Sequence, residues 1–272
     1  MKATVDYEVE YNNRARVPEN PSIMAGWAVD AAAYRERHAP RSIPYGAGAR
    51  NTIDFFPGEN EGPIVVFIHG GYWQAFDGSS FSHLARGLNA RGISVAIPSY
   101  DLCPVVTVDH IIQQMRAAAR ELARFGRSLV ISGHSAGGHL AACMLATDWA
   151  AFDASLPADL VTAAYAISGL FDLGPLVETS INNALRLDHT AARAASPLFW
   201  SPPPRGSLDA VVGENESAEY FRQSRTIVEL WGAAGIATRF GSIPGANHFT
   251  AIAPLADPAS PMVARLRELA SR

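Results

Sequence analysis

The chain has 272 residues, of which 48% are hydrophobic and 18% charged, a balance that excludes a disordered chain. The formal net charge is −4 and no basic stripe is present, which argues against a nucleic-acid partner. The length suits a single α/β domain over residues 1–272 with a substantial buried core.

Several other features exclude further classes of protein. No apolar run approaches the roughly 20 residues of a membrane span, and the N-terminal segment lacks the apolar core of a secretory signal. Cys103 and Cys143 make neither a disulfide framework nor a zinc site. The only lysine is Lys2, which excludes a P-loop and a Schiff-base mechanism. We expect a cytoplasmic protein without a membrane partner, a metal or another cofactor; a homodimer stays open.

The predicted elements alternate between strands and helices along the chain, which is the pattern of an α/β sheet. Residues 1–48 are mixed, with a short helix predicted over 27–37. Strands are predicted at 62–71, 92–100, 128–133, 160–170, 208–213 and 237–245. Helices are predicted at 79–92, 108–126, 136–147, 217–235 and 258–271. This order predicts a mostly parallel central sheet with helices on both faces.

Residues 170–206 interrupt the alternation and close on the proline-rich sequence SPLFWSPPPRG. A structureless loop of this length is unusual in a compact domain. We therefore expect a small structured cap over an active site, and the alternative is a surface loop with a helix or two.

The sequence GHSAG places Ser135 between an apolar strand and an apolar helix. Glycines at 133 and 137 allow a sharp turn that presents the serine hydroxyl above the sheet edge. The next helix points its positive N-terminus at the place where negative charge would develop. These features favour Ser135 as a nucleophile over an incidental serine in a glycine-rich turn.

A nucleophilic serine needs a base, and eight histidines compete for this role. His248 lies in the sequence SIPGANHF, after the last predicted strand, where the base of this architecture belongs. His134 is expected to point to the opposite side of the turn. His69 and His139 are expected to be structural.

The third member should be a carboxylate that orients the imidazole, located just beyond the strand before the last. Asp209 falls inside that strand and Glu219 inside the following helix, so both are poorly placed. Glu216 lies in the connecting loop and is preferred to Glu214, although a solvated glutamate at a helix start is a competing interpretation.

An oxyanion hole is also required, because stabilisation of the tetrahedral intermediate is a large part of catalysis. The sequence FIHGGYW supplies a glycine pair directly after an early strand. We assign the backbone N–H groups of Gly71, Tyr72 and Ala136 to the hole. The order Ser135, Glu216, His248 is the order expected of α/β-hydrolases.

With these residues in hand, the chain resembles the kynurenine formamidase (arylformamidase) group of α/β-hydrolases. HGGYW at 69–73 is similar to the oxyanion motif of that group, and GHSAGGHL at 133–140 to its nucleophile elbow. Segments 11–18, 168–187 and 216–224 are similar as well. The resemblance implies Ser135 as nucleophile and His248 as base. Members usually carry aspartate where this chain has Glu216.

The predicted activity is hydrolysis of a small aryl formamide, such as N-formyl-L-kynurenine, through an acyl-enzyme. Four aromatic residues are candidates for contacts with the aromatic leaving group: Tyr72, Trp73, Phe171 and Trp200. The alternatives are a carboxylesterase or amidase that uses the same residues, and, in another class, a non-catalytic binding protein with this fold.

Overall fold

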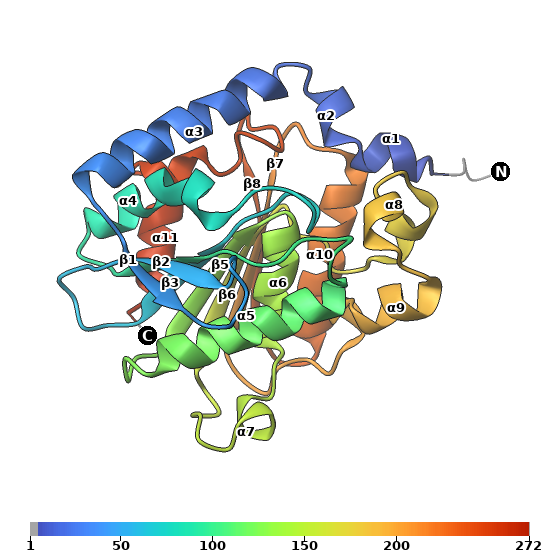
Figure 1. Cartoon of the computed structure of the whole chain (residues 1–272). Helices are drawn as coiled ribbons and strands as arrows, with labels where there is room; N and C mark the ends of the chain where they lie inside the picture. The colour runs from blue at the N-terminus through green and yellow to red at the C-terminus, as the bar shows by residue number, and fades with distance from the viewer. Residues whose placement is uncertain (1–4, 272) are drawn as a thin grey trace.

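A computed structural model describes residues 5–271 and contains one sheet of eight strands in the order β1-β2-β4-β3-β5-β6-β7-β8 (Figure 1). The strands are β1 (Arg41–Pro44), β2 (Thr52–Phe56), β3 (Ile64–Ile68), β4 (Val95–Pro98), β5 (Leu129–His134), β6 (Val161–Ile167), β7 (Ser207–Gly213) and β8 (Ala237–Ile243). β1 and β2 pair antiparallel, whereas the ladder from β4 through β8 is parallel.

The longer helices are α3 (Asn20–Arg37), α5 (Val108–Ala123), α6 (Ala136–Leu145), α10 (Ala218–Ala233) and α11 (Pro261–Leu269). The shorter α-helices are α1 (Tyr7–Tyr11), α2 (Asn13–Arg16), α4 (Ala85–Asn89), α7 (Trp149–Phe152), α8 (Asn182–Leu185) and α9 (His189–Ala194). The described residues also contain four 3₁₀ helices: η1 (Gly78–Leu84), η2 (Gly174–Glu178), η3 (Pro197–Phe199) and η4 (Ala253–Ala256).

The central strands are hydrophobic on both faces because helices cover the sheet from both sides. Every residue of β3, β5 and β7 is buried. One apolar cluster packs α5, α6 and α10 against the sheet, and a second packs α3, α4 and α11 against the opposite face. The predicted mostly parallel sheet with helices on both faces is confirmed.

Several predicted elements differ from the structure in their bounds or in their type. The predicted helix at 79–92 is divided between η1 and α4, and the short helix predicted at 27–37 is the second half of α3. Strands β1 and β2 were not predicted, and residues 170–206 form the four short helices η2, α8, α9 and η3. The first four residues of the mixed N-terminal segment lie outside the described residues.

Between residues 5 and 271 no helix is both long and apolar enough to cross a membrane. The carboxyl ends of the parallel strands β3, β5, β6 and β7 meet at one edge of the sheet, and the connections that leave this edge carry the candidate site.

Candidate active site

Ser135 occupies the turn between β5 and α6, in a strained backbone conformation with φ 55° and ψ −117°. The glycines beside it are required by close packing rather than by their own φ angles. A Cβ on Gly133 would lie 2.1 Å from the carbonyl oxygen of Gly137, and one on Gly137 would lie 1.9 Å from that of Ile68. The turn therefore seats α6 directly against the ends of β3 and β5 and presents the serine at the sheet edge.

His248 and Glu216 form a buried pair beside this turn. His248 Nδ1 lies 2.6 Å from Glu216 Oε2, and both side chains are almost fully excluded from solvent. Glu216 comes from the loop after β7, and His248 from the loop after β8. This geometry holds the imidazole ring with Nε2 left for another partner.

The other oxygen of Glu216 is fixed by two donors from neighbouring strands. The backbone N–H of Gly213 donates to Oε1 at 2.7 Å, and the Ser168 hydroxyl donates to the same atom. Ser168 follows β6, is fully buried and has φ 52°. The sequence analysis missed Ser168 as a partner of the acid; its position at the end of a parallel strand is the signal that could have suggested it.

The remaining carboxylates of this region have other partners. Asp209 pairs with Arg265 on α11, and Glu219 pairs with Arg222 and accepts a hydrogen bond from Tyr11. Glu214 accepts from the backbone N–H of Gly245. Of the four candidates, Glu216 alone contacts His248 among the described residues.

Ser135 and His248 line one cavity of about 450 Å³, which also exposes His134 and the Gly70–Gly71 turn. No hydrogen bond joins the Ser135 hydroxyl to His248 within residues 5–271. Catalytic hydrogen bonds are often longer in a free enzyme and tighten when substrate binds, so this arrangement is compatible with proton transfer.

Residues 70–73, which we call the oxyanion loop after the role predicted for them, lie next to the elbow: a Cβ on Gly70 would lie 3.0 Å from Ser135 Cβ. Gly71 has φ 105°, and Tyr72 and Trp73 follow with φ 49° and 57°. In the described part of the chain, the backbone N–H groups of Gly71, Tyr72 and Ala136 have no hydrogen-bond acceptor. These three N–H groups therefore stay the candidate donors for an oxyanion.

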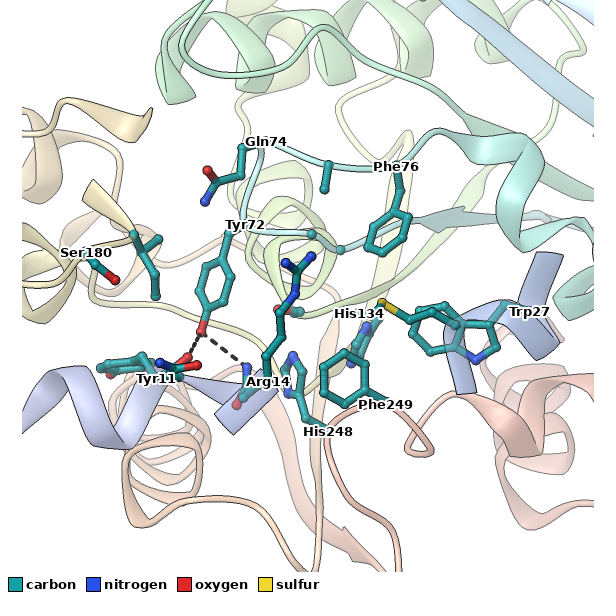
Figure 2. A pocket seen from close by; sticks show the side chains of 18 of the residues that line it. Tyr11, Arg14, Trp27, Tyr72, Gln74, Phe76, His134, Ser180, His248 and Phe249 are labelled. Carbon is teal, nitrogen blue, oxygen red and sulfur yellow. Dashed lines mark hydrogen bonds between the residues drawn. The ribbon is translucent and has the colours of Figure 1, made fainter. Parts of the chain in front are cut away.

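Hydrogen bonds tie the Tyr72 hydroxyl to the N-terminal helices (Figure 2). A further hydrogen bond joins it to Tyr220 on α10. Its hydroxyl lies 2.7 Å from the carbonyl oxygen of Tyr11, 2.8 Å from the Tyr220 hydroxyl and 3.2 Å from Asn13 Nδ2. Asn13 Nδ2 also donates to the Tyr220 hydroxyl at 2.8 Å. Burial raises the pKa of Tyr72 and Tyr220, so both hydroxyls stay protonated at neutral pH.

His134 and His139, which lie before and after the nucleophile in sequence, have different surroundings. His134 lines the cavity and its ring centroid lies 4.7 Å from that of His248, so the expectation that it points away was wrong. Burial lowers the pKa of His134 well below its usual value, which keeps the ring neutral beside His248. His139 is structural: its Nε2 lies 2.7 Å from the carbonyl oxygen of Ala195.

Of the four predicted aromatic contacts, only Tyr72 reaches the cavity. Trp73 and Phe171 are fully buried, and the Trp73 ring packs edge-on against His139. Trp200 donates from Nε1 to the carbonyl oxygen of Ala194 and stacks near Arg116. These three rings fill the core or fix the 170–206 segment instead of lining the cavity.

The aromatic wall of the cavity comes from residues that the sequence analysis did not single out: Trp27, Phe76, Phe81 and Phe249. Trp27 is the centre of this wall, with ring centroids 5.4 Å from Phe81 and 6.1 Å from both Phe76 and Phe249. Its position on α3, far from the motifs in sequence, left no signal that it belongs to the site.

The opposite side of the cavity is polar, and Arg14 reaches into it between the two walls (Figure 2). The guanidinium of Arg14 makes no ion pair or hydrogen bond to any residue within 5–271. Glu8, which also lines this side, accepts hydrogen bonds from the backbone and hydroxyl of Ser180. The 170–206 segment thus contributes to the cavity through its contact with α1.

Comparisons with known proteins agree with this geometry. The BD-FAE family model matches residues 55–178. Kynurenine formamidase of Drosophila melanogaster is 30% identical over 226 residues, covering 77% of this chain and 74% of that protein. Kynurenine formamidase of Danio rerio is 29% identical, covering 79% of this chain and 76% of that protein. The chain belongs to the kynurenine formamidase family of α/β-hydrolases.

A solved structure gives the same result for the fold. A candidate thioesterase from Silicibacter sp. TM1040 superposes with a TM-score of 0.84 and 35% identity, covering 99% of this chain and 100% of that one. Membership in the kynurenine formamidase family makes this chain a hydrolase of small molecules, and the geometry of its cavity indicates which residues to test.

Proposed function

We propose that the protein hydrolyses a small aryl formamide, such as N-formyl-L-kynurenine, through a Ser135–His248–Glu216 triad. The observation that carries the proposal is the buried Glu216–His248 pair opening onto the same cavity as Ser135. Support also comes from the kynurenine formamidase relatives and from the loop at residues 70–73, whose Gly70 packs against Ser135.

In the proposed reaction, His248 Nε2 takes the proton of the Ser135 hydroxyl as Oγ forms a bond to the formyl carbon. The N–H groups of Gly71, Tyr72 and Ala136 stabilise the resulting oxyanion. The C–N bond then breaks, and His248 returns the proton to the departing amine. Water, deprotonated by His248, hydrolyses the formyl-serine and releases formate.

Throughout both steps Glu216 accepts from His248 Nδ1 and stabilises the imidazolium that forms. Ser168 and Gly213 donate to the other carboxylate oxygen and hold Glu216 against His248.

The two walls of the cavity favour a substrate with an aromatic ring at one end and a charged group at the other. The rings around Trp27 offer stacking surface for an aryl group. Arg14 offers an unpaired guanidinium, which binds a carboxylate in a bidentate fashion. N-formyl-L-kynurenine carries both groups.

The test compares kcat/KM for N-formylkynurenine and for p-nitrophenyl acetate, in the wild-type enzyme and in Ser135→Ala. The proposal expects a large preference for the formamide and loss of both activities in the variant. Ester turnover with negligible deformylation would retain the serine mechanism and replace the substrate by a small ester. Formamide turnover that survives in Ser135→Ala would refute the triad.

A further inference from the structure

We infer that Asn13 and Tyr220 are positioning residues that hold the oxyanion loop in its active conformation through the Tyr72 hydroxyl. The inference rests on the proposed function, because it concerns the N–H group of Tyr72 as an oxyanion donor. It assigns a catalytic purpose to the N-terminal helices, which contribute neither the nucleophile nor the base nor the acid.

The hydrogen bonds around the Tyr72 hydroxyl form a closed set. A hydroxyl donates once and accepts twice. That of Tyr72 donates to the carbonyl oxygen of Tyr11 and accepts from Asn13 and Tyr220. Asn13 uses its amide nitrogen for both tyrosine hydroxyls. Because each partner is satisfied in a single arrangement, the ring of Tyr72 has one favoured position.

The backbone that carries this ring needs such a restraint. Tyr72 and Trp73 are consecutive non-glycine residues with positive φ, a conformation that persists only when the surroundings enforce it. Trp73 is enforced by burial in the core. Backbone hydrogen bonds from Gln74 N–H to the Gly71 carbonyl oxygen and from Cys103 N–H to that of Trp73 hold the loop on either side of Tyr72. Tyr72 borders the cavity, and its hydroxyl supplies the side-chain anchor of the loop.

Tyr220, which bonds to the Tyr72 hydroxyl, also contacts the proposed base His248. The Tyr220 ring lies 4.7 Å from the His248 ring, centroid to centroid, and Tyr220 is fully buried. The network therefore connects the oxyanion loop on one side of Ser135 with the imidazole on the other. Loss of the anchor is expected to misplace the transition-state contacts and to leave ground-state binding of substrate nearly unchanged.

The experiment compares Tyr72→Phe with Tyr34→Phe as a matched control. Tyr34 lies on α3 outside the cavity, and its buried ring carries a hydroxyl that donates to Asn89 at 2.8 Å. Each substitution removes one buried hydroxyl. We expect Tyr72→Phe to lower kcat about tenfold with little change in KM, as a fraction of the 10²–10³-fold effect of deleting an oxyanion donor. Tyr34→Phe is expected to leave both constants unchanged.

A second measurement separates positioning from general destabilisation. The affinity of a boronic acid inhibitor, whose serine adduct places a negative oxygen in the oxyanion hole, should fall in Tyr72→Phe in parallel with kcat/KM. Asn13→Ala, which leaves Tyr72 intact, should show the same parallel loss of inhibitor affinity and kcat/KM. This variant replaces Tyr72→Phe in the test if Tyr72→Phe does not fold. Equal kinetics in wild type, Tyr72→Phe and Asn13→Ala would overturn the inference.

The outcome is distinguishable from failure of the proposed function. If the wild-type enzyme hydrolyses neither the formamide nor the ester, the proposed function is wrong. If it hydrolyses either one and the Tyr72 and Asn13 variants match it, the triad stands and the anchor is rejected.

Discussion

Glu216 is the candidate acid of the site and the first residue to test at the level of a single side chain. Its two oxygens are divided between His248 on one side and Ser168 with Gly213 on the other. A carboxylate supported in this way fixes the tautomer of the histidine as well as its position. The role of Glu216 can therefore be tested by removing its charge while its shape is retained.

Glu216→Gln is predicted to lower kcat/KM by about 10³–10⁴-fold, because an amide that donates to His248 favours the wrong tautomer. Glu214→Gln is the matched control, since Glu214 lies two residues away and accepts only from Gly245 among the described residues. Steady-state kinetics of both variants decide between the two glutamates. A larger loss in Glu214→Gln would show that the acid has been misassigned.

Arg14 is the second single residue whose role can be tested by substitution. With its guanidinium unpaired in the cavity, Arg14→Gln is predicted to lower kcat/KM for N-formylkynurenine by about 10–100-fold, the value of one charge-assisted contact. The neutral analogue 2′-formamidoacetophenone should be hydrolysed equally well by both enzymes. Arg16→Gln is the control, because Arg16 lies on the same short helix and does not line the cavity. Equal losses for the charged and neutral substrates would contradict a carboxylate site.

The sequence permits prediction of some of these residues and not others. Ser135 and His248 each follow a strand in a glycine-containing loop, and this local pattern was sufficient to place them. Ser168 and Trp27 carry no such pattern, because their relation to the site depends on how β6 and α3 pack. Trp73 and Phe171 were misplaced since an aromatic residue next to a motif looks the same in sequence whether it faces the cavity or the core.

At the level of elements, the β5–α6 turn sets the geometry of the site. The turn is compact because neither Gly133 nor Gly137 has room for a Cβ. The sequence gives the turn and the flanking elements clearly, since apolar runs and glycines mark their ends. It does not give β1 and β2 as clearly, because they are short and antiparallel, and β1 is mostly exposed.

Gly137→Ala is predicted to destabilise the protein by about 3 kcal/mol, since its Cβ would meet the Ile68 carbonyl oxygen at 1.9 Å. Gly26→Ala is the matched control. It lies exposed in the middle of α3 with nothing within 4 Å of the new Cβ, and should stabilise by about 0.5–1 kcal/mol. Urea unfolding measures both values. A stable Gly137→Ala enzyme would show that the elbow tolerates expansion.

At the level of the whole molecule, buried histidines connect stability to pH. Burial lowers the pKa of His69 and His139 to about 4, whereas an unfolded chain has histidines near 6.5. Between these values the unfolded state binds more protons. Stability is therefore fully present above about pH 6.5 and is lost as the pH falls toward 4.

The free energy of unfolding is predicted to fall between pH 7 and pH 5, with roughly 2 kcal/mol of this loss due to His139. His139→Gln should remove that part of the difference, whatever its effect on stability at pH 7. The exposed His110→Gln should retain the wild-type difference. Urea titrations at both pH values provide the comparison, and an unchanged difference in His139→Gln would refute the assignment.

The N-terminal helices, the oxyanion loop, the elbow and the loop after β8 all line one cavity, and Ser135 is part of this lining. The central claim is that this serine is the nucleophile. The most direct test treats the enzyme with a fluorophosphonate and follows the adduct by peptide mass spectrometry and the residual formamidase activity in parallel. We predict one adduct on Ser135 whose appearance matches the loss of activity. Full activity after labelling of Ser135, or inactivation with the adduct on another residue, would contradict the account.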